Sequence, residues 1–216
     1  MSVPVIVNCE QRSPEWFGFR AGKLTGSVAS AILATLKSGG EPAARRDLRT
    51  QLAVEQITGQ PMESEGYINA AMQRGIDLEP AAVAAYEAET GYMVRKTGFV
   101  VLDDTPLGCS LDGDVQNMTG ILEIKCPKSS THVGYLRDKR LPPEYVAQVT
   151  HNMLVTGAQW CDFVSYDDRL PDGLQFFMFR VERNEAAIRA YEAEALKFLA
   201  EVAREREALL ALKAAA

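Results

Sequence analysis

The chain has 216 residues, of which 47% are hydrophobic and 24% are charged, and its formal net charge is −6. These values are typical of a globular protein with a sizeable core, and the length favours a single domain, residues 1–216. The acidic balance argues against a general nucleic-acid coat protein, although it leaves open an enzyme with a local basic surface.

Signals for export or membrane insertion are not expected. The first ten residues lack a basic start and a long apolar run, and no stretch approaches the roughly 18 apolar residues of a membrane span. We therefore expect a cytoplasmic protein, in the host cell cytoplasm if a phage or prophage encodes it, with no membrane partner. The cysteines are too widely spaced for a zinc or iron–sulfur site and are expected to be buried thiols: Cys9, Cys109, Cys126 and Cys161.

The first part of the chain predicts helices. Ser13 followed by Pro14 is a typical helix start, so we expect a short helix over residues 13–24, with Trp16 and Phe17 packed in the core. Thr25 is expected to cap a second helix that reaches Leu36. A third helix is expected over residues 42–58. Its outward arginines either form a solvated face or contact phosphate: Arg45, Arg46 and Arg49.

Residues 67–90 also have a helical pattern, but Gly75 and Pro80 interrupt it, which predicts two helices or one broken helix. Short strands are then expected at residues 92–96, 99–102, 108–111, 121–126, 161–166 and 175–181. Between them, a helix runs from about residue 141 to Gly157, with Val146 on its inner side. Asn184 is expected to cap a long final helix. This order predicts an α+β fold in which a mixed central β-sheet is flanked by helices.

One predicted strand carries charges where a buried strand should not. Side chains alternate between the two faces of a strand, so Glu123 and Lys125 share a face with Ile121. Charged groups inside an apolar strand are costly without partners, and Asp112 is the obvious neighbour. Two carboxylates beside one lysine form a site for a hard divalent cation, as in phosphodiesterases that use Mg²⁺. The alternative is a solvated face with a surface ion pair.

Several blocks of the sequence together resemble the lambda exonuclease family, also described as YqaJ-type viral recombinases or phage alkaline exonucleases. These blocks are Ser13-Pro14-Glu15-Trp16, Arg20-Ala21-Gly22-Lys23-Leu24-Thr25-Gly26-Ser27, Arg74-Gly75-Ile76-Asp77-Leu78-Glu79, Ser110-Leu111-Asp112-Gly113, Leu122-Glu123-Ile124-Lys125-Cys126-Pro127 and Ala147-Gln148-Val149. They follow the family's order and spacing. The family has a restriction-endonuclease-like core with a Pro-Asp…Asp/Glu-x-Lys motif, and Leu111 stands here where the proline usually is.

The resemblance implies a role for each matching residue. Asp112, Glu123, the Ile124 carbonyl and Glu79 would hold the metal, expected to be two Mg²⁺ ions that Mn²⁺ can replace. Lys125 would position or deprotonate the attacking water. A terminal 5′-phosphate would be held by four further residues: Arg20, Ser27, Ser110 and Gln148. His132 and His151 match no family position and are expected to be structural or exposed.

The implied function is a Mg²⁺-dependent 5′-to-3′ exonuclease. It would digest linear double-stranded DNA from its ends to mononucleotides and leave 3′ single-stranded overhangs for phage-type homologous recombination. The family also implies a homotrimeric ring around DNA and a single-strand annealing protein as a partner. A basic lining could face the DNA: Arg45, Arg46, Arg49, Arg137, Lys139 and Arg140. The alternatives are a structure- or sequence-specific endonuclease on the same core and a non-catalytic scaffold that binds DNA ends.

Overall fold

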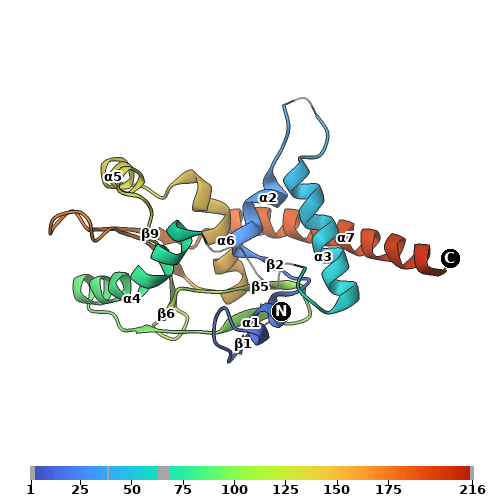
Figure 1. Ribbon diagram of the computed structural model, residues 1–216, viewed down its shortest axis with the longest axis horizontal. Coiled ribbons are helices and arrows are strands. Elements are labelled where there is room, and N and C mark those ends of the chain that lie inside the picture. Colours follow the sequence, from blue (N-terminus) through green and yellow to red (C-terminus); the bar gives the residue numbers. More distant parts are fainter. Residues whose placement is uncertain (1–2, 38, 63–68, 215–216) are drawn as a thin grey trace.

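The computed structural model describes residues 3–37, 39–62 and 69–214 (Figure 1). The helices are α1 (Pro14–Arg20), η1 (Gly26–Val28), α2 (Ala29–Leu33), α3 (Ala43–Thr58), α4 (Ala70–Thr90), α5 (Ser129–Asp138), η2 (Pro143–Tyr145), α6 (Val146–Thr156) and α7 (Glu185–Ala214). The strands are β1 (Pro4–Val7), β2 (Leu24–Thr25), β3 (Val94–Arg95), β4 (Phe99–Leu102), β5 (Leu107–Cys109), β6 (Gly113–Val115), β7 (Gly120–Lys125), β8 (Trp160–Tyr166) and β9 (Phe176–Glu182).

The strands form two mixed sheets rather than one. The first has the order β1-β4-β5-β2, in which only β2 and β5 are parallel. The second has the order β3-β6-β7-β8-β9, in which only β7 and β8 are parallel. The expected α+β class with a mixed sheet flanked by helices is confirmed, with the strands divided over two sheets. The short segment between β5 and β6 carries the chain from the first sheet to the second.

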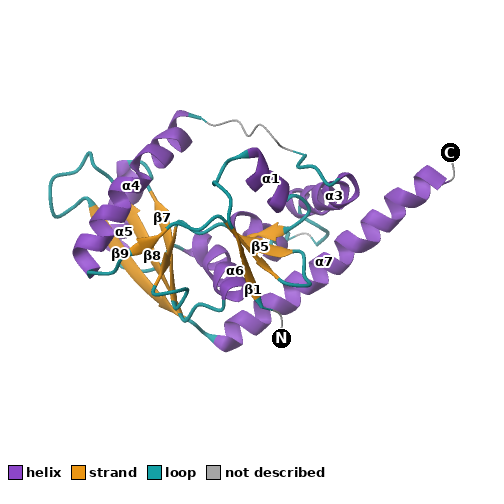
Figure 2. Ribbon diagram, turned by 90° about the horizontal axis from the view of Figure 1, so that it is seen from below, coloured by secondary structure: helices purple, strands orange, loops and turns teal. Residues whose placement is uncertain are grey.

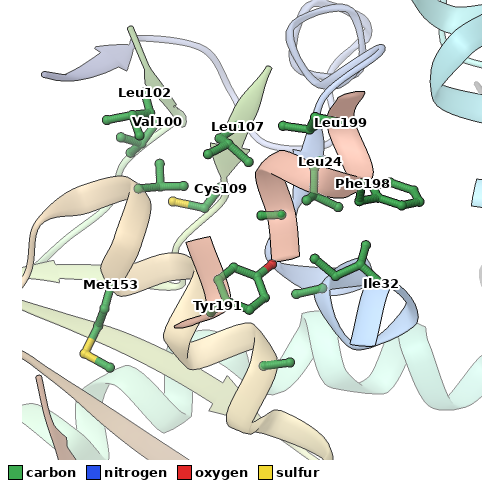
Figure 3. Packing of buried hydrophobic residues seen from close by; sticks show 14 of the residues in the cluster. Leu24, Ile32, Val100, Leu102, Leu107, Cys109, Met153, Tyr191, Phe198 and Leu199 are labelled. Carbon is green, nitrogen blue, oxygen red and sulfur yellow. The ribbon is translucent and has the colours of Figure 1, made fainter. Parts of the chain in front are cut away.

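Helix α6 lies between the two sheets and contacts strands of both (Figure 2). For this reason α6 lacks the polar, solvent-exposed side that we expected opposite Val146. His151 and Asn152 are fully buried, whereas Val146, which we expected to point inward, is 49% exposed. The main core forms where α6 meets the first sheet, α2, α3 and α7. Figure 3 shows Met153 of α6, Cys109 of β5 and Tyr191 of α7 in this cluster.

The predicted helix starts follow the expected capping chemistry in two places. Ser13 caps α1, since its Oγ accepts the N–H of Trp16 at 3.2 Å, and Pro14 occupies the first helical position. Asn184 caps α7, since its Oδ1 accepts the N–H groups of Ala186 and Ala187. Thr25 makes no capping bond, and the helix expected after it is a 3₁₀ turn followed by α2, which ends at Leu33. Leu36, expected inside, is 47% exposed.

The interruption expected in the 67–90 helix is wrong for the described part, because α4 continues through Gly75 and Pro80. The helix begins after Asn69, whose side chain accepts the N–H of Met72 at 2.9 Å. Residues 67 and 68, which we included in the helix, lie outside the described residues. The sequence analysis also missed the short strands β1, β2 and β6 and the helix α5.

Helix α7 is the longest element, with 30 residues, and both views show its far end extending away from the other elements (Figures 1 and 2). Its first half contributes Ile188, Tyr191 and Phe198 to the main core. In the part of the chain that the structure describes, neither α7 nor any other helix combines the length and the apolar character needed to cross a bilayer.

Candidate active site

Strand β7 places Glu123 and Lys125 at the centre of the second sheet. Both neighbouring strands pair along β7, with Gly113 of β6 opposite Leu122 and Phe163 of β8 opposite Glu123. Leu122 and Ile124 pack in an apolar cluster on one face, while Ile121 belongs to the main core on the other. Glu123 therefore points toward the same side of β7 as Ile121, into the protein interior, and its side chain is only 2% exposed. The expected separation of the two faces is confirmed.

Asp112 lies in the bend between β5 and β6, close to the same strand. Its Oδ2 accepts the backbone N–H of Ile124 at 2.6 Å, which fixes the carboxylate beside β7 between Glu123 and Lys125. The negative charge of the nearby Glu123 carboxylate contributes to a raised pKa of Asp112. The two carboxyl groups and the lysine that the sequence singled out are thus brought together.

Glu123 is held by three hydrogen-bond donors. Lys125 Nζ lies 2.6 Å from Glu123 Oε1, and Gln148 Nε2 donates to the same oxygen at 2.6 Å. Asn152 Nδ2 donates to Oε2 at 3.1 Å. Because a buried carboxylate is costly unless it is paired and hydrogen-bonded, these donors explain how β7 tolerates Glu123.

The buried charges shift one another's pKa values. Burial, followed by the Glu123 carboxylate, raises the pKa of Asp112 to about 8, and Lys125 and the Ile124 N–H oppose this rise only in part. Burial would lower the pKa of Lys125, but the carboxylates of Glu123 and Asp112 outweigh burial and raise it. Without a further cation, Lys125 is therefore an ammonium group, which suits it to hold a water molecule or a phosphate oxygen rather than to remove a proton.

Lys125 has a second contact that the sequence analysis did not identify. Its Nζ lies 5.1 Å from the centre of the Tyr145 ring, within the range of a cation–π interaction. The Tyr145 ring in turn packs on Phe163, which is fully buried, with the ring centres 5.1 Å apart. The lysine is therefore fixed between a carboxylate and an aromatic face.

Glu79 reaches the same site from helix α4. Glu79 and Asp112 line one cavity of about 300 Å³, and the Glu79 charge contributes to the raised pKa of Asp112. Arg12 also lines this cavity and lies 3.4 Å from the Glu79 carboxylate. All four predicted catalytic residues therefore face one region: Glu79, Asp112, Glu123 and Lys125.

The chemistry of these groups fits Mg²⁺. The ligands that the sequence proposed are oxygen atoms, which a hard cation prefers, and the raised pKa of Asp112 reflects negative charge that lacks full compensation. Within the described ranges, no three His, Cys, Asp or Glu side chains form a ready metal cage. Mg²⁺ does not need one, since it usually keeps several waters and binds one or two carboxylates together with substrate phosphates.

A second polar cluster surrounds Arg20 at the end of α1. Its guanidinium donates to Ser110 Oγ at 3.2 Å, Ser27 Oγ at 3.3 Å and Thr25 Oγ1 at 3.4 Å. Burial is the main cause of the lowered pKa of Arg20. A guanidinium beside several hydroxyl groups and the exposed Ser27 is a suitable site for an anion such as phosphate. Three of the four residues expected to hold a phosphate are therefore together: Arg20, Ser27 and Ser110.

Trp16 is buried, as the sequence predicted, and it also contacts this cluster, which the sequence did not indicate. Its indole N–H donates to Ser110 Oγ at 3.0 Å, and the Arg20 guanidinium lies over its ring at 4.3 Å. The planar guanidinium stacks on this ring, which restricts its orientation while its donors point toward the hydroxyl groups.

Gln148 differs from the other three predicted phosphate ligands. Its amide nitrogen is bonded to Glu123, not to the Arg20 cluster. However, its Cγ lies about 3.4 Å from where a Cβ on Gly26 would be, next to Ser27. Gln148 therefore lies between the carboxylates and the cluster of Arg20, Ser27 and Ser110, which we name the anion cluster because it suits an anionic ligand.

Two of the proposed DNA-lining arginines are in a different environment from the one expected. Arg45 lies 2.6 Å from both Glu41 and Glu201, and Arg49 is paired with Glu41 and with Glu205 at 3.0 Å. Both form ion pairs in a network that joins α3 to α7, so their predicted outward position is wrong. The other proposed residues are exposed: Arg46, Arg137, Lys139 and Arg140.

The two histidines are structural, as expected, whereas the expectation of four buried thiols is correct for only two of the cysteines. His132 bonds Ser165 and Leu174, and His151 bonds Tyr191 and Gly108, all within buried surroundings. Burial lowers the pKa of His151 to about 4, so its ring is neutral. Cys109 and Cys161 are buried free thiols, whereas Cys9 and Cys126 are only partly buried.

Comparisons with known proteins agree with this arrangement. The sequence profile described as a YqaJ-like viral recombinase domain matches residues 15–159. An alkaline exonuclease from Laribacter hongkongensis, LHK-Exo, is 42% identical in one crystal structure, with a TM-score of 0.82 over 94% of this chain and 98% of that chain. Its complex with dAMP gives 40% identity and a TM-score of 0.84 over the same shares.

A phage-related exonuclease from Haemophilus somnus 129PT is similar in fold alone, with 15% identity and a TM-score of 0.62 over 88% of this chain and 96% of that chain. A comparison with curated protein sequences found no match.

Proposed function

The chain belongs to the YqaJ-like viral recombinase family, and we propose that it is a Mg²⁺-dependent exonuclease that digests linear double-stranded DNA from its 5′ ends. The expected family and the nuclease fold are confirmed by the match over residues 15–159 and by the likeness to an alkaline exonuclease. A nuclease activity is supported at this level. The metal, the direction of digestion and the products are our proposal.

One observation carries the proposal: an anion cluster adjoins a carboxylate–lysine site through a single short segment. Ser110, which accepts hydrogen bonds from Arg20 and Trp16, is separated from Asp112 by only Leu111. Two extended residues span at most about 7 Å. A phosphate bound at Arg20 would therefore have the next phosphate of the same strand close to Asp112 and Glu123.

The metal would be held by Asp112, Glu123, the Ile124 carbonyl and Glu79, with Mn²⁺ able to replace Mg²⁺ and two ions as the expected number. When bound, Mg²⁺ supplies positive charge at the scissile phosphate and a more acidic water. The oxygen ligands and the uncompensated charge at Asp112 support this assignment.

The residues of the chain then have separate tasks. Arg20, Ser27 and Ser110 would bind the terminal 5′-phosphate, and this contact selects an end rather than an internal bond. The Lys125 ammonium, fixed by Glu123 and Tyr145, would hold the attacking water or a phosphate oxygen in line. Release of one nucleotide at a time from the 5′ end leaves a 3′ overhang, the substrate needed for recombination by strand annealing.

Assembly and partners form part of the same proposal. We infer a homotrimeric ring around the duplex and a single-strand annealing protein that receives the 3′ overhang, both implied by the family. Exposed cations remain for the DNA path on α3 and at the end of α5: Arg46, Arg137, Lys139 and Arg140. Light scattering coupled to size exclusion tests the trimer, since a monomer at working concentration would contradict it.

A digestion assay tests the function. Linear duplex with 5′-phosphate ends, linear duplex with 5′-hydroxyl ends and covalently closed circular duplex are incubated with Mg²⁺ or with EDTA. We expect mononucleotides from the first substrate, slower digestion of the second and none of the third, and no digestion in EDTA. Cutting of the closed circle would instead identify an endonuclease. Binding of DNA ends without hydrolysis would identify a non-catalytic scaffold.

A further inference from the structure

Asn152 is a buried amide at the centre of the site that the family resemblance did not include. It lies one helical turn after Gln148 on α6, so that both amides are on the same side of the helix. Gln148 donates to one oxygen of Glu123 at 2.6 Å and Asn152 to the other at 3.1 Å. Asn152 is 1% exposed. The two amides therefore fix the plane of the Glu123 carboxylate.

The other end of the Asn152 amide faces the anion cluster. A Cβ on Gly26 would lie 2.2 Å from Asn152 Oδ1, which means that Gly26 lets the two segments approach this closely. Gly26 immediately precedes Ser27, whose hydroxyl accepts from Arg20. Asn152 Oδ1 is buried and has no hydrogen-bond partner among the described residues. The reverse orientation of the amide would set this oxygen against Glu123, so the carboxylate determines which way the amide faces.

We propose that Asn152 is a positioning residue that holds Glu123 for metal binding and links it, through Gly26, to the segment that binds the terminal phosphate. This inference rests on the proposed function and adds a physical connection between its two halves. An amide is rigid and planar, and here it is enclosed on both sides. A shift of residues 26–27 on phosphate binding therefore moves the Asn152 amide and, with it, Glu123.

The first experiment measures metal binding directly, without DNA. Mn²⁺ and Mg²⁺ are titrated calorimetrically into the metal-free wild type, Asn152→Leu and Asn152→Ser. Leucine has a similar size but no donor, so the affinity should fall roughly 10–100-fold, as for other residues that orient a metal ligand. Serine keeps a donor at a greater distance and should give an intermediate loss. Thr150→Ala is the matched control, since the Thr150 hydroxyl bonds only to Val146 O of its own helix.

The second experiment tests the link with the anion cluster. Gly26→Ala should weaken metal binding because the new methyl group would lie 2.2 Å from Asn152 Oδ1 and displace it, although the nearest atoms to this methyl group belong to no proposed metal ligand. The same change in the Asn152→Ser background should cost nothing further, since the shorter side chain leaves room for the methyl group. The preference for 5′-phosphate ends is measured as the ratio of kcat/KM for 5′-phosphate ends to that for 5′-hydroxyl ends. This ratio should be lower in Gly26→Ala than in the wild type. In the double variant it should equal the ratio of Asn152→Ser.

Two results would overturn the proposal. If Asn152→Leu binds Mn²⁺ as the wild type does, or, should this variant not fold, if Asn152→Ser does so, Asn152 does not position Glu123. If the losses in Gly26→Ala and Asn152→Ser simply multiply in the double variant, the two residues are not coupled. The metal titrations do not depend on DNA digestion, so an inactive wild type would refute the proposed function and leave the test of Asn152 intact.

Discussion

The carboxylate of Asp112 accepts the backbone N–H of Ile124 across 2.6 Å, at the residue that lies between Glu123 and Lys125 on strand β7. A loop residue is thereby fixed to the middle of a strand. This bond brings together groups that are eleven or more residues apart in the sequence, and it holds Asp112 beside a second carboxylate that raises its pKa.

Asp112 should make the metal-free protein less stable as the pH rises. In the folded protein its pKa is about 8, whereas an unfolded aspartate titrates near 4, so the folded state binds more protons between these values. The contribution of Asp112 to stability should therefore fall from about pH 4 toward pH 8, and Asp112→Asn isolates it from the opposite contribution of His151 below pH 6.5. Thermal unfolding in EDTA at several pH values measures this, and Asp112→Asn should flatten the dependence.

Divalent cations should reverse this effect in the wild type. Because Mg²⁺ binds the ionised carboxylates of the folded state, it should raise the melting temperature at pH 8, with a gain that grows with its concentration. Asp112→Asn should show little gain and lose DNA hydrolysis. An equal gain in both proteins would place the metal elsewhere.

Recognition of 5′-phosphate ends should depend on the guanidinium group of Arg20 and not only on its positive charge. Arg20→Lys keeps the charge but loses the planar donors that face Ser27 and Ser110 and the stacking on Trp16. We expect KM for 5′-phosphorylated ends to rise roughly 10-fold or more, which corresponds to one charge-assisted hydrogen bond. Duplex with 5′-hydroxyl ends is the control and should change little. Equal losses on both substrates would argue against phosphate recognition by Arg20.

Arg45 should contribute to stability rather than to DNA binding. It joins Glu41 of the preceding loop to Glu201 of α7 and lies 5.1 Å from the ring of Phe198. Arg45→Met should lower the free energy of unfolding by about 1–2 kcal/mol, measured with urea, because Glu201 loses its ion pair and Glu41 keeps only Arg49. Arg46→Met is the matched control: its pair with Asp47 is exposed, and its effect should stay within about 0.5 kcal/mol. A loss of DNA affinity without a loss of stability in Arg45→Met would contradict this view.

His151 should make the protein sensitive to acid. The neutral ring donates Nε2–H to Gly108 O and accepts from the Tyr191 hydroxyl, and burial lowers its pKa to about 4. For this group the unfolded state binds more protons between pH 6.5 and 4, so the contribution of His151 to stability should fall as the pH falls through this range, by on the order of 3 kcal/mol. Urea unfolding of wild type and His151→Gln at pH 7 and pH 4.5 measures the difference. An equal acid loss in both would exclude His151 as a cause.

The sequence was sufficient where a single local rule decides the structure. The alternation on residues 121–126, the Ser13 cap and the Asn184 cap depend only on neighbours in the chain, and the structure has all three. The likeness to a family placed Arg20, Ser27 and Ser110 together, which no periodicity could have done.

The remaining features depend on contacts between distant segments. Arg45 has the spacing of an exposed residue, and only the approach of α7 gives it Glu201 as a partner. Asn152 and His151 lie on the side of α6 that an amphipathic helix would expose to solvent. They are buried because α6 lies between the two sheets. Trp16 is an aromatic residue on a short helix, and nothing local indicates that its N–H meets Ser110, 94 residues away.

The passage of the chain from one sheet to the other at residues 110–112 also sets the size of the fragment that the enzyme would release. Ser110 is anchored by Arg20 on one side and Asp112 by Ile124 on the other. The distance between the proposed phosphate contact and the proposed metal site therefore depends on one intervening residue, Leu111, which is 1% exposed in the core. An added residue would extend this segment by at most about 3.5 Å, roughly half of its present reach, so we expect it to misalign the two proposed sites and to slow cleavage.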